Sequence, residues 1–316
     1  MRAVVMRARG GPEVLEVADL PVPEPGPKEV RVRLKAAALN HLDVWVRKGV
    51  ASPKLPLPHV LGADGSGVVD AVGPGVEGFA PGDEVVINPG LSCGRCERCL
   101  AGEDNLCPRY QILGEHRHGT YAEYVVLPEA NLAPKPKSLS FEEAAAIPLT
   151  FLTAWQMVVD KLGVRPGDDV LVMAAGSGVS VAAIQIAKLF GARVIATAGS
   201  EDKLRRAKAL GADETVNYTH PDWPKEVRRL TGGKGADKVV DHTGALYFAG
   251  VIKATANGGR IAIAGASSPA SNASHSAANT SKLAPAGSDP VSDPSIPPTR
   301  STRPLSCCRP IPSSIR

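Results

Sequence analysis

The chain has 316 residues, a hydrophobic fraction of 43% and a formal net charge of +4. This length predicts two domains with a sizeable core. The charge is too small to indicate a nucleic-acid partner, and no apolar run approaches the length of a bilayer-spanning helix. We therefore expect a cytoplasmic protein that acts on a small molecule and has no membrane partner.

Residues 1–135 contain short β-type segments separated by Gly and Pro. Apolar residues alternate over Ala3–Met6 and Glu29–Leu34, a further strand is expected at Glu84–Ile87, and Asn40–Lys48 has the pattern of one short helix. Many short strands with this punctuation predict an irregular β-barrel domain.

Four of the six cysteines lie close together within residues 91–109, with the spacing C-x2-C-x2-C-x7-C: Cys93, Cys96, Cys99 and Cys107. Two-residue gaps direct successive thiolates at one centre, and the longer segment returns a fourth ligand. Four thiolates form a closed tetrahedral site, so we expect a structural Zn²⁺. An iron–sulfur cluster or free thiols are the alternatives. Three arginines could offset the negative charge of the site: Arg95, Arg98 and Arg109.

A nucleotide-binding pattern follows two short helical segments, which are broken at Pro148. Residues Asp169–Lys203 run through strand, tight turn, helix and strand, with apolar runs at Val170–Ala174 and Val194–Thr197. This is one right-handed βαβ unit. Its turn and helix N-terminus direct amide N–H groups at an anion, usually a pyrophosphate.

The glycine fingerprint of this turn is imperfect. Counted from Gly176, the G-x-G-x-x-G frame falls on Gly176, Gly178 and Val181; aligned on the helix, it falls on Ala175, Ser177 and Ser180. The second set is small enough for a phosphate to approach the backbone. The alternative is a crossover that binds no ligand. We expect the cofactor to contact Ala175, Gly176, Ser177, Gly178 and Val179.

The end of the second strand indicates which nucleotide binds. An NAD site needs Asp or Glu there for the ribose 2′-hydroxyl, but this chain has Ala198, Gly199 and Ser200, followed by the basic residues Lys203, Arg205 and Arg206. This pattern favours NADPH over NADH. Glu201 and Asp202 are the counter-evidence, although they fit the first turn of a helix that Ser200 caps. The alternative is that these basic residues lie on a solvent-exposed helix face and bind no phosphate.

Three more strands complete a Rossmann doubly wound parallel sheet over residues 136–266: Glu214–Tyr218, Asp237–Asp241 and Arg260–Ala264. Ligands of such sheets bind at the carboxyl ends of the strands. Residues at these ends are therefore expected at the cofactor: Asn217, Tyr218, Thr243 and Gly265. His242 is either a proton relay or an ordinary loop histidine.

Residues 267–316 are rich in Ser, Pro and Ala and contain no aromatic residue. Such a composition cannot offset its ordering entropy by burial. We expect a disordered tail, which is either natural or the result of a frame shift after Ser267 or Ser268. The pair Cys307 and Cys308 is interpreted as incidental.

Several motifs up to about Gly265 resemble the medium-chain dehydrogenase/reductase family, which includes zinc-containing alcohol dehydrogenases and quinone oxidoreductases. They are AAALNHLDVW, PHVLGADGSGVVDAVGPGV, the four-cysteine lobe and GTYAEYVVLP. The resemblance implies an α/β protein with a GroES-like catalytic barrel, a nucleotide domain and an active site in the cleft between them. It also implies a homodimer or homotetramer, but the segment expected to form it is not recognisable here.

The family's catalytic zinc requires a Cys, a His-Glu pair and a second Cys. The matching positions are Asn40, Ala63-Asp64 and Leu149 or a neighbour, so we expect no catalytic zinc. Asn40 and Asp43 resemble the zinc-free quinone oxidoreductase branch, and Thr153 matches a position beside the nicotinamide. These three are the expected catalytic residues. A nonstandard zinc site built from His41, Asp43, His59 and Asp64 is conceivable.

The sequence therefore predicts an NADPH-dependent oxidoreductase that reduces a small carbonyl, enone or quinone, with a structural zinc. One alternative is a zinc alcohol dehydrogenase with a nonstandard catalytic site. Another, of a different class, is an NADPH-binding protein without turnover.

Overall fold

The computed structural model describes residues 1–265. The expectations for 267–316, including those for Cys307 and Cys308, lie outside the described residues. No helix among the described residues is long and apolar enough to cross a bilayer.

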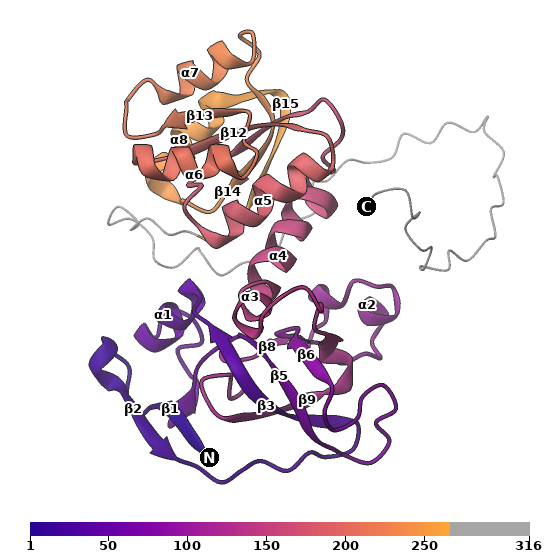
Figure 1. Cartoon of the computed structure of the whole chain (residues 1–316). Coiled ribbons are helices and arrows are strands. Elements are labelled where there is room, and N and C mark those ends of the chain that lie inside the picture. The colour runs from indigo at the N-terminus through magenta and orange to yellow at the C-terminus, as the bar shows by residue number, and fades with distance from the viewer. Residues whose placement is uncertain (266–316) are drawn as a thin grey trace, which may run out of the picture. The chain divides into compact units, whose positions relative to one another are not determined.

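The N-terminal domain is built on a five-stranded antiparallel sheet in the order β10-β6-β5-β3-β9 (Figure 1). The register between β3 and β5 shifts twice, as expected of an irregular barrel. Its core consists of inward-facing aliphatic residues such as Val30, Val32 and Ile87. The strands are β3 (Glu29–Ala38), β5 (Asp64–Val72), β6 (Glu84–Ile87), β9 (Tyr124–Pro128) and β10 (Leu132–Pro134).

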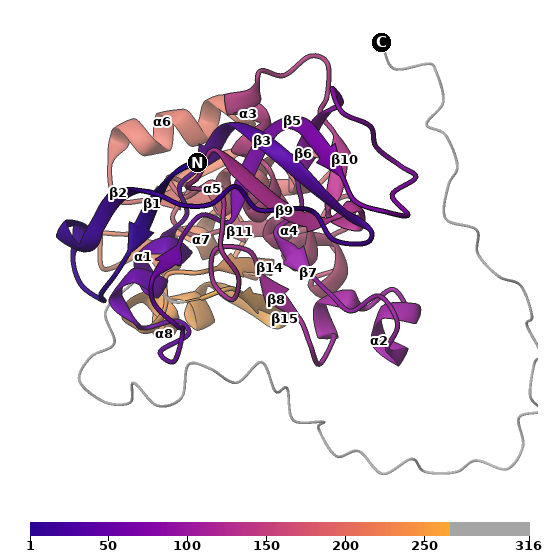
Figure 2. The ribbon, with the colours of Figure 1, turned by 90° about the horizontal axis from the view of Figure 1, so that it is seen from below.

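Smaller elements surround this sheet. A second antiparallel sheet has the order β2-β1-β4, and β7 pairs with β8. The remaining strands are β1 (Arg2–Met6), β2 (Leu15–Asp19), β4 (His59–Val60), β7 (Gly90–Leu91) and β8 (Gln111–Ile112). The helices are α1 (His41–Lys48) and α2 (Glu97–Leu100), with 3-10 turns at Pro12–Val14, Asp104–Leu106 and Glu129–Asn131. Figure 2 shows α2 at the periphery, away from β3 and β5.

Two short helices follow this domain. They are α3 (Phe141–Ala145) and α4 (Pro148–Trp155), and a π-helical segment, Gln156–Lys161, continues α4. Ser140 caps α3 by accepting from the Glu143 amide, and Pro148 occupies the first turn of α4, where its missing N–H costs nothing. The predicted break at Pro148 is confirmed.

The C-terminal domain is a parallel sheet in the order β13-β12-β11-β14-β15. Its strands are β11 (Asp169–Val172), β12 (Arg193–Ala198), β13 (Glu214–Asn217), β14 (Ala236–Asp241) and β15 (Thr255–Ile263). Its helices are α5 (Gly178–Leu189), α6 (Glu201–Ala209), α7 (Trp223–Leu230) and α8 (Ala245–Ala254). The expected strands and the helices α5 and α6 are confirmed, whereas α7 and α8 were not identified from the sequence.

Alternating residues of the parallel strands form two separate cores. Val170 and Val172 pack with residues of α4 and α5, whereas Leu171 and Met173 pack with residues of α7 and α8. Helices therefore cover both faces of the sheet, which confirms the doubly wound fold.

Candidate functional site

The turn between β11 and α5 has the geometry expected of a phosphate-binding turn. Ala174 has φ +50°, a left-handed conformation that usually requires glycine. The backbone N–H of Ala175 donates to the Thr197 carbonyl at 2.7 Å, which ties the turn to β12. Neither glycine frame pointed to Ala174, because an alanine gives no sequence signal of a positive φ.

A cavity of about 440 Å³ opens at the carboxyl end of the parallel sheet. Eight of the predicted site residues line it: Asn40, Gly176, Ser177, Gly178, Val179, Ala198, Lys203 and Tyr218. His41 and His242, which the sequence suggested as a zinc ligand and a proton relay, also line it, as do three residues that were not predicted at the site: Leu39, Thr150 and Ala174. The cavity thus joins the nucleotide turn to the segment that begins α1.

Two larger hollows, of about 720 and 510 Å³, surround Trp223 on α7. Neither is lined by a residue of the nucleotide turn or of the Asn40 segment. We assign the site to the smaller cavity because the chemically informative residues converge there. Of the predicted cofactor residues, only Asn217 lines one of the larger hollows.

The other predicted cofactor residues do not line the cavity. Gly199 packs against Tyr218, since a Cβ at Gly199 would meet the Tyr218 ring at 3.3 Å. Ser200 is the N-cap residue of α6, as predicted. Thr243 donates its hydroxyl to Asp241 Oδ1 at 2.6 Å, and a Cβ at Gly265 would meet Trp45 of α1 at 2.9 Å.

The basic residues after β12 have different surroundings. Arg205 and Arg206 both pair with Asp202 at 3.0 Å and are mostly exposed. The aliphatic stem of Lys203 lies over Gly176, and within residues 1–265 its ammonium group has no ion-pair partner. Lys203 is therefore the one cation of the three that faces the cavity.

Asn40, Asp64 and Leu149 are joined by hydrogen bonds. The Asn40 side chain donates to Asp64 Oδ2 at 2.9 Å, and the Leu149 backbone N–H donates to Asp64 Oδ1 at 2.9 Å. Asp64 is 1% exposed, and this burial raises its pKa to about 6. Three residues at or beside the family's catalytic zinc positions, Asn40, Asp64 and Leu149, are thus joined through a buried carboxylate.

Asp43 does not line the cavity but is hydrogen-bonded to Asn40, which does. Its carboxylate accepts from the Asn40 N–H at 2.8 Å, the Tyr121 hydroxyl at 2.7 Å and the Gly62 N–H at 3.2 Å. Burial raises its pKa, although these donors act in the opposite direction. Its contacts are those of a residue that positions Asn40.

Thr153 is half-buried on α4, where its hydroxyl donates to the Leu149 carbonyl at 2.7 Å. Thr150, one turn earlier, lines the cavity instead, and its methyl group lies against Gly178. The helical period places both threonines near the same face, but only the structure distinguishes them.

The residues considered for a nonstandard zinc site do not form a ligand cluster. Within residues 1–265, the four cysteines form the only group of three or more ligand side chains close enough to share a metal. His59 is 3% exposed and lies 3.1 Å from the Gly114 carbonyl, and burial lowers its pKa to about 4. His41 packs edge-on against Trp45.

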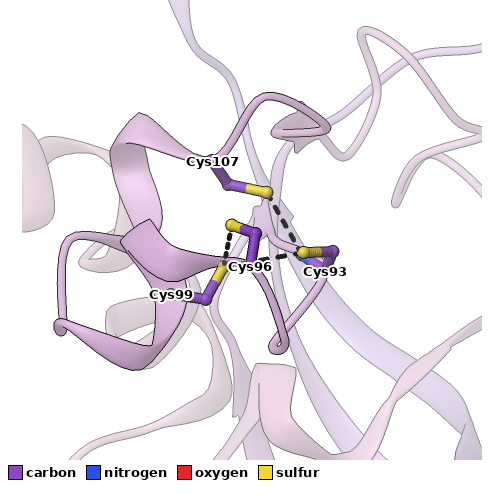
Figure 3. Close-up of side chains that lie close together, drawn as sticks. All are labelled: Cys93, Cys96, Cys99 and Cys107. Atoms are coloured by element: carbon purple, nitrogen blue, oxygen red, sulfur yellow. Dashed lines mark hydrogen bonds between the residues drawn. The ribbon is translucent and has the colours of Figure 1, made fainter.

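The four cysteine sulfurs point toward one another (Figure 3). All four lie within 4.8 Å of one another, with separations of 3.4 Å for Cys96–Cys99 and 3.8 Å for Cys93–Cys99. A tetrahedron with Zn–S bonds of about 2.3 Å has edges of roughly 3.8 Å, so this donor set fits zinc.

The surroundings of the cluster favour the thiolate at Cys93 but not at Cys96, where the Cys99 backbone N–H lowers the pKa but burial and the other cysteine sulfurs outweigh it and raise the pKa to about 11. The Arg95 backbone N–H, with further donors including the Arg109 side chain, lowers the pKa of Cys93 to about 5. Arg98 instead pairs with Glu103 at 2.5 Å. Of the three arginines considered for charge compensation, Arg109 is the one whose side chain contacts a cysteine of the cluster.

Comparison with known proteins identifies the family. Residues 26–137 match the alcohol dehydrogenase GroES-like domain, and residues 178–286 match the zinc-binding dehydrogenase domain. A zinc-type alcohol dehydrogenase-like protein of Schizosaccharomyces pombe is 38% identical over 84% of this chain and 76% of its own length. A quinone oxidoreductase of Pseudomonas aeruginosa is 37% identical over 77% of this chain and 66% of its own length.

A crystal structure described as that of an NAD-dependent alcohol dehydrogenase is 99% identical over 85% of this chain and 78% of its own, with a TM-score of 0.84. The chain therefore belongs to the medium-chain dehydrogenase/reductase family and is a nicotinamide-dependent oxidoreductase of the alcohol dehydrogenase and quinone oxidoreductase type.

Proposed function

We propose that the chain is an NADPH-dependent reductase of a small carbonyl, enone or quinone, with a structural zinc in the four-cysteine lobe and no catalytic zinc. One observation carries this proposal. The cavity that reaches the nucleotide turn ends at Asn40, and Asn40 is held by Asp64 at the place where the family's alcohol dehydrogenases hold a metal. No cysteine or histidine occupies positions 40, 63, 64 or 149.

The residues that line the cavity have two roles in this proposal: they bind the coenzyme and they polarise the substrate. The left-handed turn at Ala174 and the first turn of α5 present backbone N–H groups to a pyrophosphate. The bound nicotinamide supplies the hydride. The Asn40 amide nitrogen has two hydrogens and gives one to Asp64. The second can polarise a substrate carbonyl, which is the role that a metal otherwise plays.

Charge at the end of β12 supports NADPH as the coenzyme. Lys203 is available to a 2′-phosphate, and Ala198 provides no carboxylate that would repel it. Of the two acidic residues in the first turn of α6, Glu201 and Asp202, Asp202 is paired with Arg205 and Arg206. The preference for NADPH over NADH therefore rests on Lys203.

A second candidate is an NAD-dependent alcohol dehydrogenase. The 99% identical protein of known structure, which is described as having that activity, favours it. The two candidates differ in coenzyme and in the number of zinc ions, and both quantities can be measured.

The direct test is oxidation of NADPH and of NADH by the purified protein with a panel of enones, quinones and aldehydes, followed by nicotinamide absorbance. We expect turnover with NADPH at a kcat/KM above that with NADH. Turnover of alcohols with NAD⁺ at a higher kcat/KM would establish the second candidate. Tight NADPH binding without oxidation on any substrate would contradict catalysis and indicate a binding protein.

A further inference from the structure

Ser180 occupies the third small-residue position of the nucleotide fingerprint, and its side chain is fully buried. A glycine at this position serves close packing of helix against strand. Ser180 adds a hydroxyl there, which lies 2.6 Å from the Met173 carbonyl and 2.8 Å from His242 Nε2. The serine therefore joins the end of β11, the first turn of α5 and the end of β14.

These two contacts determine the tautomer of His242. A hydroxyl has one hydrogen, and that of Ser180 is donated to the Met173 carbonyl, which can only accept. The contact with His242 must then run from Nε2–H to the Ser180 oxygen. In a neutral ring with Nε2 protonated, Nδ1 is the acceptor.

His242 remains neutral in this setting. It is 7% exposed, and burial lowers its pKa, although the neighbouring Asp241 and a hydrogen bond with the backbone of His242 itself act in the opposite direction. The other charged or titratable groups that line the same cavity are Lys203, His41 and Tyr218. A neutral ring with an acceptor nitrogen can bind a hydroxyl or an amide N–H but not a phosphate, which offers only acceptors at neutral pH.

We propose that Ser180 is a positioning residue that fixes His242 as the Nε2–H tautomer, so that His242 Nδ1 accepts a hydrogen bond from a neutral donor of the bound nucleotide, a ribose hydroxyl or the carboxamide N–H. This inference rests on the proposed function only in that the cavity binds a nicotinamide nucleotide. It does not require NADPH to be preferred or any substrate to be turned over.

The test compares Ser180→Ala and Ser180→Gly with His242→Phe and the double variant Ser180→Ala/His242→Phe. Glycine is the usual residue at this position, so Ser180→Gly keeps a foldable turn while removing the hydroxyl. Nucleotide dissociation constants are measured by fluorescence and calorimetry, without substrate. We expect each single variant to weaken NADPH binding about five- to tenfold. The double variant should bind no more weakly than His242→Phe alone, because both changes remove the same hydrogen bond, the one between His242 Nδ1 and the nucleotide.

Ser66→Ala is the matched control. Ser66 is also fully buried and also donates its hydroxyl to a carbonyl at 2.6 Å, that of Phe141, but it has no hydrogen bond to a histidine within residues 1–265. It should lower the melting temperature and leave the NADPH dissociation constant unchanged. If Ser180→Ala behaves in the same way, the hydroxyl has only a structural role and the proposal is wrong.

The ring nitrogens of His242 provide a spectroscopic readout. Nitrogen-15 NMR of the wild type, with the His242 signals assigned by their loss in His242→Phe, should show the Nε2–H tautomer, and Ser180→Ala should give a mixture. A wild-type ring protonated at Nδ1 would overturn the proposal. Binding of 2′-phospho-ADP-ribose identifies the donor: an equal effect of Ser180→Ala on it and on NADPH indicates a ribose hydroxyl, and an effect on NADPH alone indicates the carboxamide.

Discussion

The side-chain amide of Asn40 donates to the carboxylate of Asp64 across 2.9 Å, and this bond joins the loop before α1 to the start of β5. The other oxygen of Asp64 accepts from the Leu149 N–H on α4. A carboxylate that is 1% exposed thus holds together two segments, each with a residue that lines the cavity, Asn40 and Thr150. Since ionised Asp64 only accepts, the Asn40 amide must present its nitrogen to it.

The first prediction concerns the pH dependence of stability at Asp64. Its pKa is about 6 in the folded protein against an ordinary value of 3.8, so the folded state holds the proton more tightly. The stabilisation is present below about pH 4 and is lost as pH rises through about 6, by about 3 kcal/mol. The free energy of unfolding of the wild type, minus that of Asp64→Asn, should therefore fall over this range.

Urea unfolding at a series of pH values measures this difference. Asp19→Asn is the control, because Asp19 is an exposed carboxylate at the end of β2 and should leave the curve unchanged. Parallel wild-type and Asp64→Asn curves would show that Asp64 ionises in the folded protein as it does in the unfolded chain.

The second prediction concerns His59, whose contribution has the opposite sign. Its pKa is about 4 in the folded protein against an ordinary value of 6.5. The stabilisation is present above about pH 6.5 and is lost as pH falls toward 4, by up to about 3 kcal/mol. Because Asp64 and His59 act oppositely over the same range, the wild-type curve alone reveals neither.

Replacement of the histidine separates the two effects. His59→Gln should remove the loss of unfolding free energy on acidification, again measured by urea unfolding, whereas the exposed His220→Gln should not. A His59→Gln protein that loses stability between pH 6.5 and 4 as steeply as the wild type would contradict the burial argument.

Much of the fold could be predicted from sequence because its signals are local. The cysteine spacing located the four-cysteine cluster, and the succession of apolar runs located β11, β12 and α5. Helix α8 was missed because it is apolar with little amphipathic periodicity, which leaves no distinct helical signal. Helix α7 begins with Trp-Pro after a turn. A proline is typical of loops as well as of the first turn of a helix, so the strongly amphipathic segment that follows it was not recognised as a helix.

The site was predicted less completely, because its contacts join distant segments. Thr150 and Thr153 are one turn apart, and only packing against Gly178 places Thr150 at the cavity. The left-handed backbone at Ala174 leaves no trace in the sequence. The bond between Ser180 and His242 spans 62 residues, so neither side chain indicates the other.

The third prediction concerns metal content. Purified protein should contain about one zinc per chain by elemental analysis, and Cys93→Ser should lose it, because three thiolates no longer close a structural site. Asp64→Asn is the control and should retain the zinc. Two zinc ions per chain, with one surviving in Cys93→Ser, would reveal a catalytic metal and favour the alcohol dehydrogenase candidate.

The fourth prediction concerns coenzyme choice. Lys203→Met removes the cation at the cavity while keeping the aliphatic stem over Gly176. It should weaken NADPH binding about tenfold and leave NADH binding unchanged, because only the 2′-phosphate needs the charge. Arg205→Met is the matched control, since Arg205 is exposed and paired with Asp202. An equal loss for both coenzymes would place Lys203 at the pyrophosphate instead.

The fifth prediction concerns Asn40. Asn40→Ala removes the N–H proposed to polarise the substrate and also leaves one oxygen of Asp64 without its partner. Loss of one donor to a developing oxyanion typically costs about 10²–10³ in kcat. We expect a loss of that order in kcat, with the NADPH dissociation constant within about twofold of the wild type, because the nucleotide is held mainly by the turn at the end of β11.

A second substitution separates polarisation from support of Asp64. Asn40→Asp retains the size of the side chain but places a second carboxyl group against Asp64, so at neutral pH it should be as inactive as Asn40→Ala. In this variant the upper pKa of the carboxyl pair lies above the value of about 6 that Asp64 has beside Asn40, because a second carboxyl group replaces a donor that lowers it. The first proton is shared between the two carboxyl groups, so activity should partly return only at lower pH, where both groups are protonated and one can donate to the substrate. Stopped-flow measurement of hydride transfer across pH provides the readout. Wild-type rates in Asn40→Ala would exclude Asn40 from polarisation and leave that role to water.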